Sequence, residues 1–266
     1  MKGLKDLVCG DFKADNISTE DLSQLQVQWY NESIGNMNEE DGIECDICKN
    51  KGYIQYLDGH YQKIKECSCM KKRKQLRRAK KSGLGSYITK RSSDFKVTEQ
   101  WQVEMYEKMF SYCSTPNNNW FCALGTSGCG KTLLCSIIAN HLLLNLGKSV
   151  QYITWTDFIS QLKRDMMSDA TESANSTLHE IKNVEVLFID ELLKKYNETD
   201  LKYIIEIINY RYTNNLVTLV TSEKTMDELL DIDEASFSRL IEKCESFVIN
   251  IAKDRNKNQR LKGLKR

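Results

Sequence analysis

The sequence contains a single proline, Pro116, and no apolar run near the roughly 18 residues that span a membrane. Because proline is scarce, helices and strands can run long, and their ends are expected at glycines and at changes of charge. The first residues reach Asp6 and Asp11 before a signal-like apolar stretch can form. With 41% hydrophobic and 28% charged residues, the composition is that of a folded globular chain. We therefore expect a cytoplasmic protein with no membrane partner.

Net charge is also small, at +1, but it is distributed unevenly. Residues 1–62 carry 5 Lys/Arg and 12 Asp/Glu, residues 63–91 carry 12 and 1, and residues 253–266 carry 7 and 1. An acidic head is thus followed by a basic segment, a nearly neutral body and a basic tail. Such polarity predicts contact with nucleic acid or with an acidic partner surface.

Cysteine is abundant, but disulfide frameworks belong to short secreted chains, so the ten cysteines indicate thiols and metal ligands. Two pairs have metal-ligand spacing, Cys45 with Cys48 and Cys67 with Cys69, and 18 residues separate the pairs. Four thiolates suit a tetrahedral Zn²⁺ ion, which would substitute for a core in so small a unit. Four free buried thiols are the alternative. We predict a small β-rich zinc knuckle without an open catalytic position.

Residues 17–37 predict one helix, capped by Ser18 or Thr19. Leu22, Leu25 and Trp29 lie on one stripe of this helix. Residues 70–82 have helical composition with almost no apolar face, which indicates a solvated helix or a linker.

From residue 93 the sequence alternates between helical and strand-like segments. A helix is expected over residues 98–113. Five apolar runs have strand length: Trp120–Leu124, Val150–Thr154, Val184–Asp190, Leu216–Thr221 and Phe247–Ile251. Helical patterns between the runs imply crossover connections. We predict an α/β fold with a five-stranded parallel sheet covered by helices, and two domains, 1–85 and 86–266.

A phosphate-binding loop follows the first of these strands. The run GTSGCGKT between Gly125 and Thr132 leads into a helical segment, which is the context that this motif requires. Its glycines allow backbone N–H groups to face phosphates, Lys131 would reach the β- and γ-phosphates, and Thr132 would bind Mg²⁺. The predicted ATP/ADP-binding residues are Gly125, Thr126, Ser127, Gly128, Cys129, Gly130, Lys131, Thr132 and Leu133.

A second part of the site is expected where two later strands end. The strand VLFID ends in Asp190, which would hold Mg²⁺ with Thr132, and Glu191, which would activate the attacking water. The presence of Glu191 favours hydrolysis over a passive switch. Thr221 and Ser222 follow the next strand and would sense the γ-phosphate or position the water; capping the next helix is the alternative.

With these motifs, the body resembles the AAA+ ATPases, and within them the DnaC/DnaI-type helicase loaders, related phage replication proteins and IstB-like transposition ATPases. The resemblance covers roughly residues 85–256 and rests on GTSGCGKT, VLFIDE, INYRY, the strand ending TSE, and SFSRL. It implies that Arg239 is an arginine finger that reaches a neighbouring subunit's ATP; a helix-surface salt bridge is the alternative. It also implies that Arg255 contacts the nucleotide bound by its own subunit; a solvated tail is the alternative. Arg211 is a candidate for an inter-subunit contact, and the packed end of a helix is the alternative. Little chain remains for a helical lid, so the lid is expected to be reduced.

The resemblance also implies a function. It suggests an ATPase, weak unless assembled, that docks on a DnaB-type replicative helicase through the zinc head and helps place it on single-stranded DNA in phage or bacterial replication. Six copies per ring are expected. An IstB-like transposition regulator and a nucleotide-dependent replisome adaptor without useful turnover are the alternatives. Lys163 and Arg164 are candidates for DNA contact, and so is the segment Lys71–Lys81, for which a solvated linker is the alternative. Trp155, Phe158 and Leu162 are expected in the core.

Overall fold

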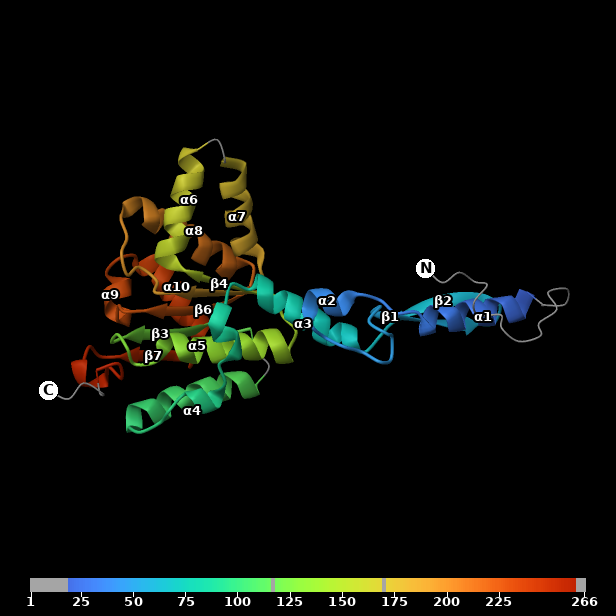
Figure 1. Cartoon of the computed structure of the whole chain (residues 1–266). Coiled ribbons are helices and arrows are strands. Elements are labelled where there is room, and N and C mark those ends of the chain that lie inside the picture. The colour runs from blue at the N-terminus through green and yellow to red at the C-terminus, as the bar shows by residue number, and fades with distance from the viewer. Residues whose placement is uncertain (1–18, 116–117, 169–170, 262–266) are drawn as a thin grey trace. The chain divides into compact units, whose positions relative to one another are not determined.

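A computed structural model describes residues 19–115, 118–168 and 171–261 (Figure 1). The chain separates into two compact units, Met1–Leu76 and Arg77–Arg266, and the division falls inside helix α3 (Cys69–Lys81). It therefore lies earlier than the boundary expected after residue 85.

The end of α3 explains this difference, because the residues after it pack within the second unit. Tyr152 donates its backbone N–H to the carbonyl of Ser82 at 2.6 Å, and Arg78 donates a guanidinium N–H to the carbonyl of Gly147. Leu84 is fully buried in the core of that unit. The predicted solvated helix over 70–82 is present, but its Met70 and Arg73 side chains are buried in the first unit.

The first unit has four elements before α3: α1 (Thr19–Glu32), α2 (Met37–Asp41), β1 (Tyr53–Asp58) and β2 (Tyr61–Glu66). Strands β1 and β2 form an antiparallel hairpin that lies between the two cysteine pairs in the chain. This hairpin confirms the β-rich knuckle.

The prediction of one helix over 17–37 is wrong only after Glu32, because residues 33–36 are not helical and Met37 begins α2. Helix α1 ends at Glu32 because Lys51 donates its ammonium hydrogens to the carbonyls of Asn31 and Ser33, and Gly35 donates its N–H to Lys49 O at 2.6 Å. These contacts turn the chain onto the cysteine knuckle, which local periodicity cannot reveal. Ser18, one of the two expected caps, lies outside the described residues, and Thr19 is already helical.

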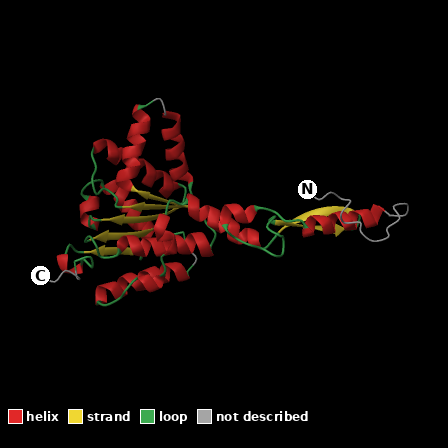
Figure 2. Ribbon diagram, viewed as in Figure 1, coloured by secondary structure: helices red, strands yellow, loops and turns green. Residues whose placement is uncertain are grey.

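The second unit contains the predicted parallel sheet, shown in yellow in Figure 2. Its strand order is β4-β5-β6-β3-β7, and every pair is parallel. The strands are β3 (Phe121–Gly125), β4 (Val150–Thr154), β5 (Val186–Asp190), β6 (Val217–Ser222) and β7 (Val248–Ile251), each within two residues of its predicted bounds.

Helices cover both faces of this sheet (Figure 1). Alternate residues of β3 point to opposite faces of the sheet. Phe121 and Ala123 belong to the hydrophobic cluster on one face, which two helices cover, and Cys122 and Leu124 belong to the cluster on the other face. The two helices are α4 (Gln100–Ser114) and α5 (Lys131–Asn140), which continues into a π-helix, η5 (His141–Asn145). The opposite face has α6 (Trp155–Met167), α7 (Thr171–Asn183), α8 (Glu198–Thr213), α9 (Met226–Leu230) and α10 (Glu234–Cys244). The α/β prediction is therefore confirmed.

Short 3-10 helices complete the described chain: η3 (Gly85–Thr89), η4 (Ser92–Asp94) and, after β7, η6 (Arg255–Lys257). Through residue 261, η6 is the only helix that follows the sheet, in keeping with a reduced lid. No helix within the described ranges is long and apolar enough to cross a bilayer.

Arg211, on α8, is a structural residue of the core. Its side chain is fully buried and donates to Thr218 Oγ1 at 2.9 Å and to four backbone carbonyls. These carbonyls, from Ile181, Lys182, Val184 and Val217, join the end of α7 to the starts of β5 and β6. Burial lowers the pKa of Arg211 to about 9. The expected inter-subunit contact is therefore wrong, and the packed helix end is confirmed.

Replacing Arg211 should destabilise the protein strongly. Arg211→Ala leaves buried carbonyls without donors, so we expect the free energy of unfolding to fall by about 3 kcal/mol. Arg211→Lys cannot reproduce the planar set of donors and should recover only part of this loss. Urea denaturation followed by far-UV circular dichroism measures both, with exposed Arg164→Ala as the control. A loss below about 0.5 kcal/mol for Arg211→Ala, the range of ordinary surface changes, would contradict this role.

Candidate functional site: a phosphate-binding loop and a cysteine cluster

The phosphate loop connects β3 to α5 in a backbone conformation that depends on glycine. Gly125 has a φ of 100°, and a Cβ atom at this position would lie 1.7 Å from the carbonyl oxygen of Ile251 on β7. Gly130, with a φ of 98°, precedes the first residue of α5. The loop therefore turns sharply at the carboxyl end of the sheet and presents the N-terminus of α5, the arrangement that binds phosphate.

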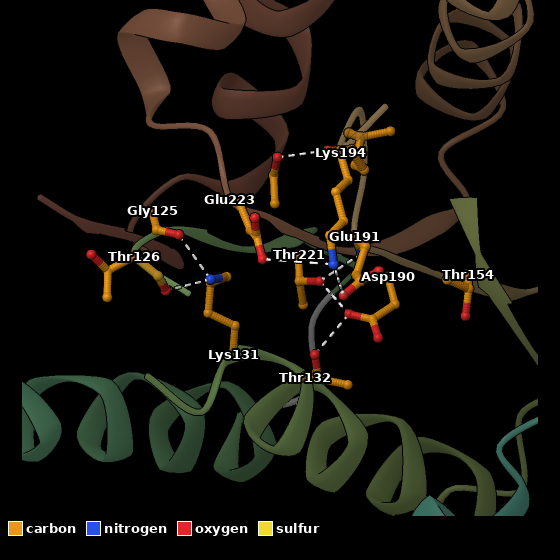
Figure 3. A network of polar contacts seen from close by, with 12 residues as sticks. Gly125, Thr126, Lys131, Thr132, Thr154, Asp190, Glu191, Lys194, Thr221 and Glu223 are labelled. Carbon is orange, nitrogen blue, oxygen red and sulfur yellow. Dashed lines mark hydrogen bonds and ion pairs between the residues drawn. The ribbon is translucent and has the colours of Figure 1, made fainter. Parts of the chain in front are cut away.

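Lys131 lies inside this loop, at the start of α5. Its ammonium group donates to the carbonyls of Gly125 at 2.8 Å and Thr126 at 2.6 Å (Figure 3). Burial lowers the pKa of Lys131, while nearby acidic groups, including Glu223 and Asp190, oppose the shift. A buried ammonium at a helix N-terminus is suited to bind an anion from the cavity.

Asp190, at the end of β5, accepts hydrogen bonds from three hydroxyl groups. Thr132 of α5 donates to Oδ1 at 2.9 Å, Thr221 of β6 also donates to Oδ1, and Tyr152 of β4 donates to Oδ2 at 2.9 Å. Figure 3 shows Thr132, Thr221 and Asp190 turned toward one another. Since carboxylate and hydroxyl oxygens are ligands that Mg²⁺ prefers, the paired Thr132 and Asp190 fit the predicted magnesium site.

Glu191 follows Asp190 and forms a small charged network. Its backbone has a φ of 56°, and its N–H donates to Thr221 Oγ1 at 3.0 Å. The ammonium of Lys194 lies 2.8 Å from Glu191 Oε1 and 3.9 Å from Glu223 Oε1 (Figure 3). The hydrogen bond to Glu191 raises the pKa of Lys194. The carboxylate expected to activate water is thus held by a cation of its own chain.

A cavity of about 230 Å³ brings these elements together. Its lining includes Lys131, Thr132, Glu191, Thr221 and Ser222 from the predicted set, with Ser127, Gly128, Gly130 and Leu133 of the loop. Sequence reasoning missed three lining residues, Tyr87, Glu223 and Arg260. Arg255 does not line this cavity; it lines an adjacent one of about 550 Å³ together with Ser127 and Lys194.

Thr221 and Ser222, treated alike in the sequence, have different contacts. The Thr221 hydroxyl donates to Asp190 and accepts from the Glu191 N–H, so it positions the Asp190 carboxylate and the Glu191 backbone. The Ser222 hydroxyl is buried, donates to Leu192 O at 2.7 Å and accepts from the Lys224 N–H, so it holds the turn after β6.

Arg239 lies on the exposed surface of α10, outside the lining of the phosphate cavity. It donates to Asn209 Oδ1 at 2.6 Å, and its guanidinium carbon lies 5.8 Å from the centroid of the Tyr212 ring. The alternative expected from sequence was a helix-surface salt bridge, but Arg239 forms none with the described residues. The position leaves the guanidinium accessible to another chain.

The other candidates divide between core and surface. Trp155, Phe158 and Leu162 are buried in the core, as expected. Lys163, a DNA candidate, instead forms an ion pair with Asp200 at the start of α8.

The four predicted metal ligands form one cluster in the first unit. The sulfur atoms of Cys45, Cys48, Cys67 and Cys69 lie within 4.8 Å of one another. The Cys45–Cys67 and Cys48–Cys69 sulfur distances are 3.7 and 3.6 Å. A tetrahedral zinc ion with bonds of about 2.3 Å requires sulfur atoms about 3.8 Å apart, so the cluster fits Zn²⁺. His60 is not part of it.

Polar groups around the cluster position the cysteines. Gly52 donates its N–H to Cys48 Sγ at 3.2 Å. A hydrogen bond from the Cys48 backbone lowers the pKa of Cys45 to about 7, whereas burial raises the pKa of Cys69 to about 12. Arg73, fully buried on α3, is ion-paired with Asp41 and donates to Ile43 O at 2.6 Å. The ion pair joins α3 to the end of α2, and the hydrogen bond to Ile43 joins α3 to the loop before Cys45; the sequence did not reveal either contact.

Comparisons with known proteins agree with this geometry. The family described as IstB-like ATP binding protein matches residues 49–262. The phage-like element PBSX protein XkdC of Bacillus subtilis (strain 168) is 27% identical over 78% of this chain and 82% of its own. The replicative helicase loader DnaC of Escherichia coli (strain K12) is 30% identical over 51% of this chain and 56% of its own. The chain thus spans about half the length of DnaC.

Similarity of fold extends to solved structures. The crystal structure of DnaI is 22% identical and superposes with a TM-score of 0.52 over 63% of this chain and 93% of that chain. At this level of identity the likeness establishes the fold alone, a five-stranded parallel sheet covered by helices.

Arg260 and Arg255 should differ in their effect on nucleotide binding. Arg260 lines the phosphate cavity and Arg255 does not, so Arg260→Ala should weaken ATP binding about tenfold, the loss of one charge-assisted hydrogen bond. Arg255→Ala serves as the matched control. It should change the ATP affinity less than threefold, because an exposed charge outside the cavity contributes at most about 0.5 kcal/mol. Calorimetric titration with ATP and Mg²⁺ measures both. Equal losses would assign the arginines the same role.

Removing the metal should unfold the first unit selectively. A zinc chelator, or Cys48→Ser, should expose the chain before residue 77 to protease while the second unit stays resistant and binds ATP, because the metal substitutes for a core. Zinc content and limited proteolysis measure this result, with Cys113→Ser, outside the cluster, as the control. Resistance of the metal-free head to protease would contradict the prediction.

Proposed function

Because the chain belongs to the family of IstB-like ATP-binding proteins, we propose that it is an ATP-dependent loader of a DnaB-type replicative ring helicase. In this role it binds the helicase, helps deliver it onto single-stranded DNA during phage or bacterial replication, and acts in the cytoplasm. The observation that carries the proposal is the phosphate site with Asp190 and Glu191 at its edge, in a chain that is 30% identical to a replicative helicase loader over 51% of its length.

Each residue of the site has a defined role in the proposed hydrolysis. Lys131 and the loop N–H groups bind the phosphates, and Thr132 and Asp190 hold Mg²⁺, which neutralises charge on the phosphates. Glu191 accepts a proton from the attacking water once its carboxylate leaves Lys194. Arg239 supplies positive charge to the ATP of a neighbouring copy, since it is exposed and outside its own cavity. Turnover therefore depends on assembly, for which we propose six copies per helicase ring.

The first unit has the surface that docking requires. It contributes nine of the fifteen large hydrophobic side chains that are exposed among the described residues. On α1, Leu22, Leu25 and Trp29 are 46%, 50% and 47% exposed, so the stripe predicted from sequence faces solvent instead of filling a core. Apolar patches of this kind mark protein interaction sites. The patch supports attachment of the helicase to the zinc head.

Two sets of variants test the proposal in the full-length protein. Lys131→Ala should abolish ATP binding and helicase loading while leaving helicase capture intact, because the patch is on the other unit. Leu22→Ser with Trp29→Ser should lower helicase capture at least about tenfold, since buried aromatic anchors dominate interface energies, and leave ATP binding unchanged. Met167→Ser, which removes an apolar side chain 90% exposed on the ATPase unit, is the control. Capture is measured by surface-immobilised helicase and loading by DNA unwinding.

The outcomes separate loading from the alternatives. Normal loading by Lys131→Ala would refute the ATP-dependent step. Equal, near-zero hydrolysis by wild type and Glu191→Gln, with helicase and DNA present, would favour an adaptor without turnover. Capture of a transposase but no helicase would favour an IstB-like transposition regulator, the function consistent with the name of the matched family.

A further inference from the structure

A further cavity of the ATPase unit has no part in the site described above. It has a volume of about 460 Å³ and lies where α4 and α5 pack side by side (Figure 1). Its lining includes Lys90, Arg91, Phe110, Asn140 and His141. We propose that this cavity binds a nucleotide unit, its phosphate at Lys90 and Arg91 and its base against Phe110.

The charge of the cavity selects an anion. Lys90 and Arg91 line it, and its lining contains no aspartate or glutamate. Neither cation has an ion-pair partner among the residues that the structure describes. Burial lowers the pKa of His141, which favours its neutral ring, so Lys90 and Arg91 are the cations of the lining. A phosphate group is the natural partner for two adjacent cations.

The apolar part of the lining selects a flat ring. Phe110 is 60% exposed although it lines a cavity, and Met109, Ile137 and Leu144 lie beside it. An exposed aromatic side chain next to cations is the usual platform for a nucleobase, because every base has a face that stacks. A volume of this size is within the range of small-molecule sites.

Asn140 has a side-chain oxygen, Oδ1, that has no hydrogen-bond donor among the described residues. Its amide donates to Tyr87 O at 2.7 Å and to Lys90 O at 2.9 Å, which fixes the segment that carries the cations. Its Oδ1 atom is buried and accepts no hydrogen bond from any described residue. A base carries N–H groups that supply this bond. The adjoining turn is the π-helix η5, and such turns often occur at functional sites.

The cavity is separate from the ATP site. The linings of the two share no residue. Lys131 and Asn140, one from each lining, are the first and last residues of α5, so their backbones are about 14 Å apart along a helix that rises 1.5 Å per residue. A substitution at Lys131 therefore removes ATP at a distance from Asn140.

Binding in a Lys131→Ala background tests the proposal with two probes. AMP, measured by calorimetry, represents a free nucleotide, and a short fluorescein-labelled oligodeoxyadenylate, measured by anisotropy, represents a nucleotide within a strand. Lys90→Ala with Arg91→Ala, and separately Phe110→Ala, should each lower affinity about tenfold, in line with the loss of phosphate contacts or of one stacked base. Lys90→Arg with Arg91→Lys keeps both charges and is the matched control.

Each outcome decides the question. Loss of AMP binding in these variants supports a free-nucleotide site, and loss of oligonucleotide binding alone supports a site for a base of single-stranded DNA. No binding of either probe, or affinities equal to the parent in all variants, would overturn the proposal. Helicase capture by the same variants should be unchanged, so failure here is distinguishable from failure of the loader function.

Discussion

The hydrogen bonds to the Asp190 carboxylate are the interaction on which the second unit depends. They bring together β4, β5, β6 and the first turn of α5, four elements that are far apart in the sequence. Asp190 is almost fully buried, and burying a carboxylate is costly unless it accepts hydrogen bonds. Thr132, Thr221 and Tyr152 provide them, so the same contacts that make the buried charge tolerable also place a magnesium ligand beside the phosphate loop.

Much of this unit could be predicted from sequence because its signals are local. Apolar runs of strand length separated by helical patterns require parallel strands with crossovers, and the ends of parallel strands meet at one edge of the sheet. The same reasoning places Lys131, Thr132, Asp190 and Thr221 together at this edge. The Cys45-to-Cys69 pattern worked for the same reason, since ligand spacing within a short segment constrains its fold.

The features that sequence reasoning missed or misjudged all depend on contacts between distant segments. The buried Arg73–Asp41 pair and the carbonyls around Arg211 satisfy polar groups that come together only in the folded chain. Arg260 reaches the phosphate cavity although Arg255 better resembles the family pattern, because the chain after β7 folds back so that Gln259 donates its N–H to Gly128 O. The hydrophobic periodicity of the sequence cannot predict that a distant segment folds back onto the phosphate loop. The apolar stripe of α1 was found, but its exposure was not, because periodicity identifies a face and not what covers it.

The ion pair between Lys194 and Glu191 bears on when the proposed ATPase turns over. A carboxylate that activates water must be free to accept a proton from it, whereas Glu191 Oε1 is engaged by the ammonium of Lys194 at 2.8 Å. Lys194 also lies near Glu223 of the turn after β6, so it can be exchanged between two carboxylates without leaving the site. Positive charge brought by Arg239 of another copy would compete with Lys194 for the same acids. In the proposed assembly, this competition would release Glu191 and make hydrolysis depend on contact between copies.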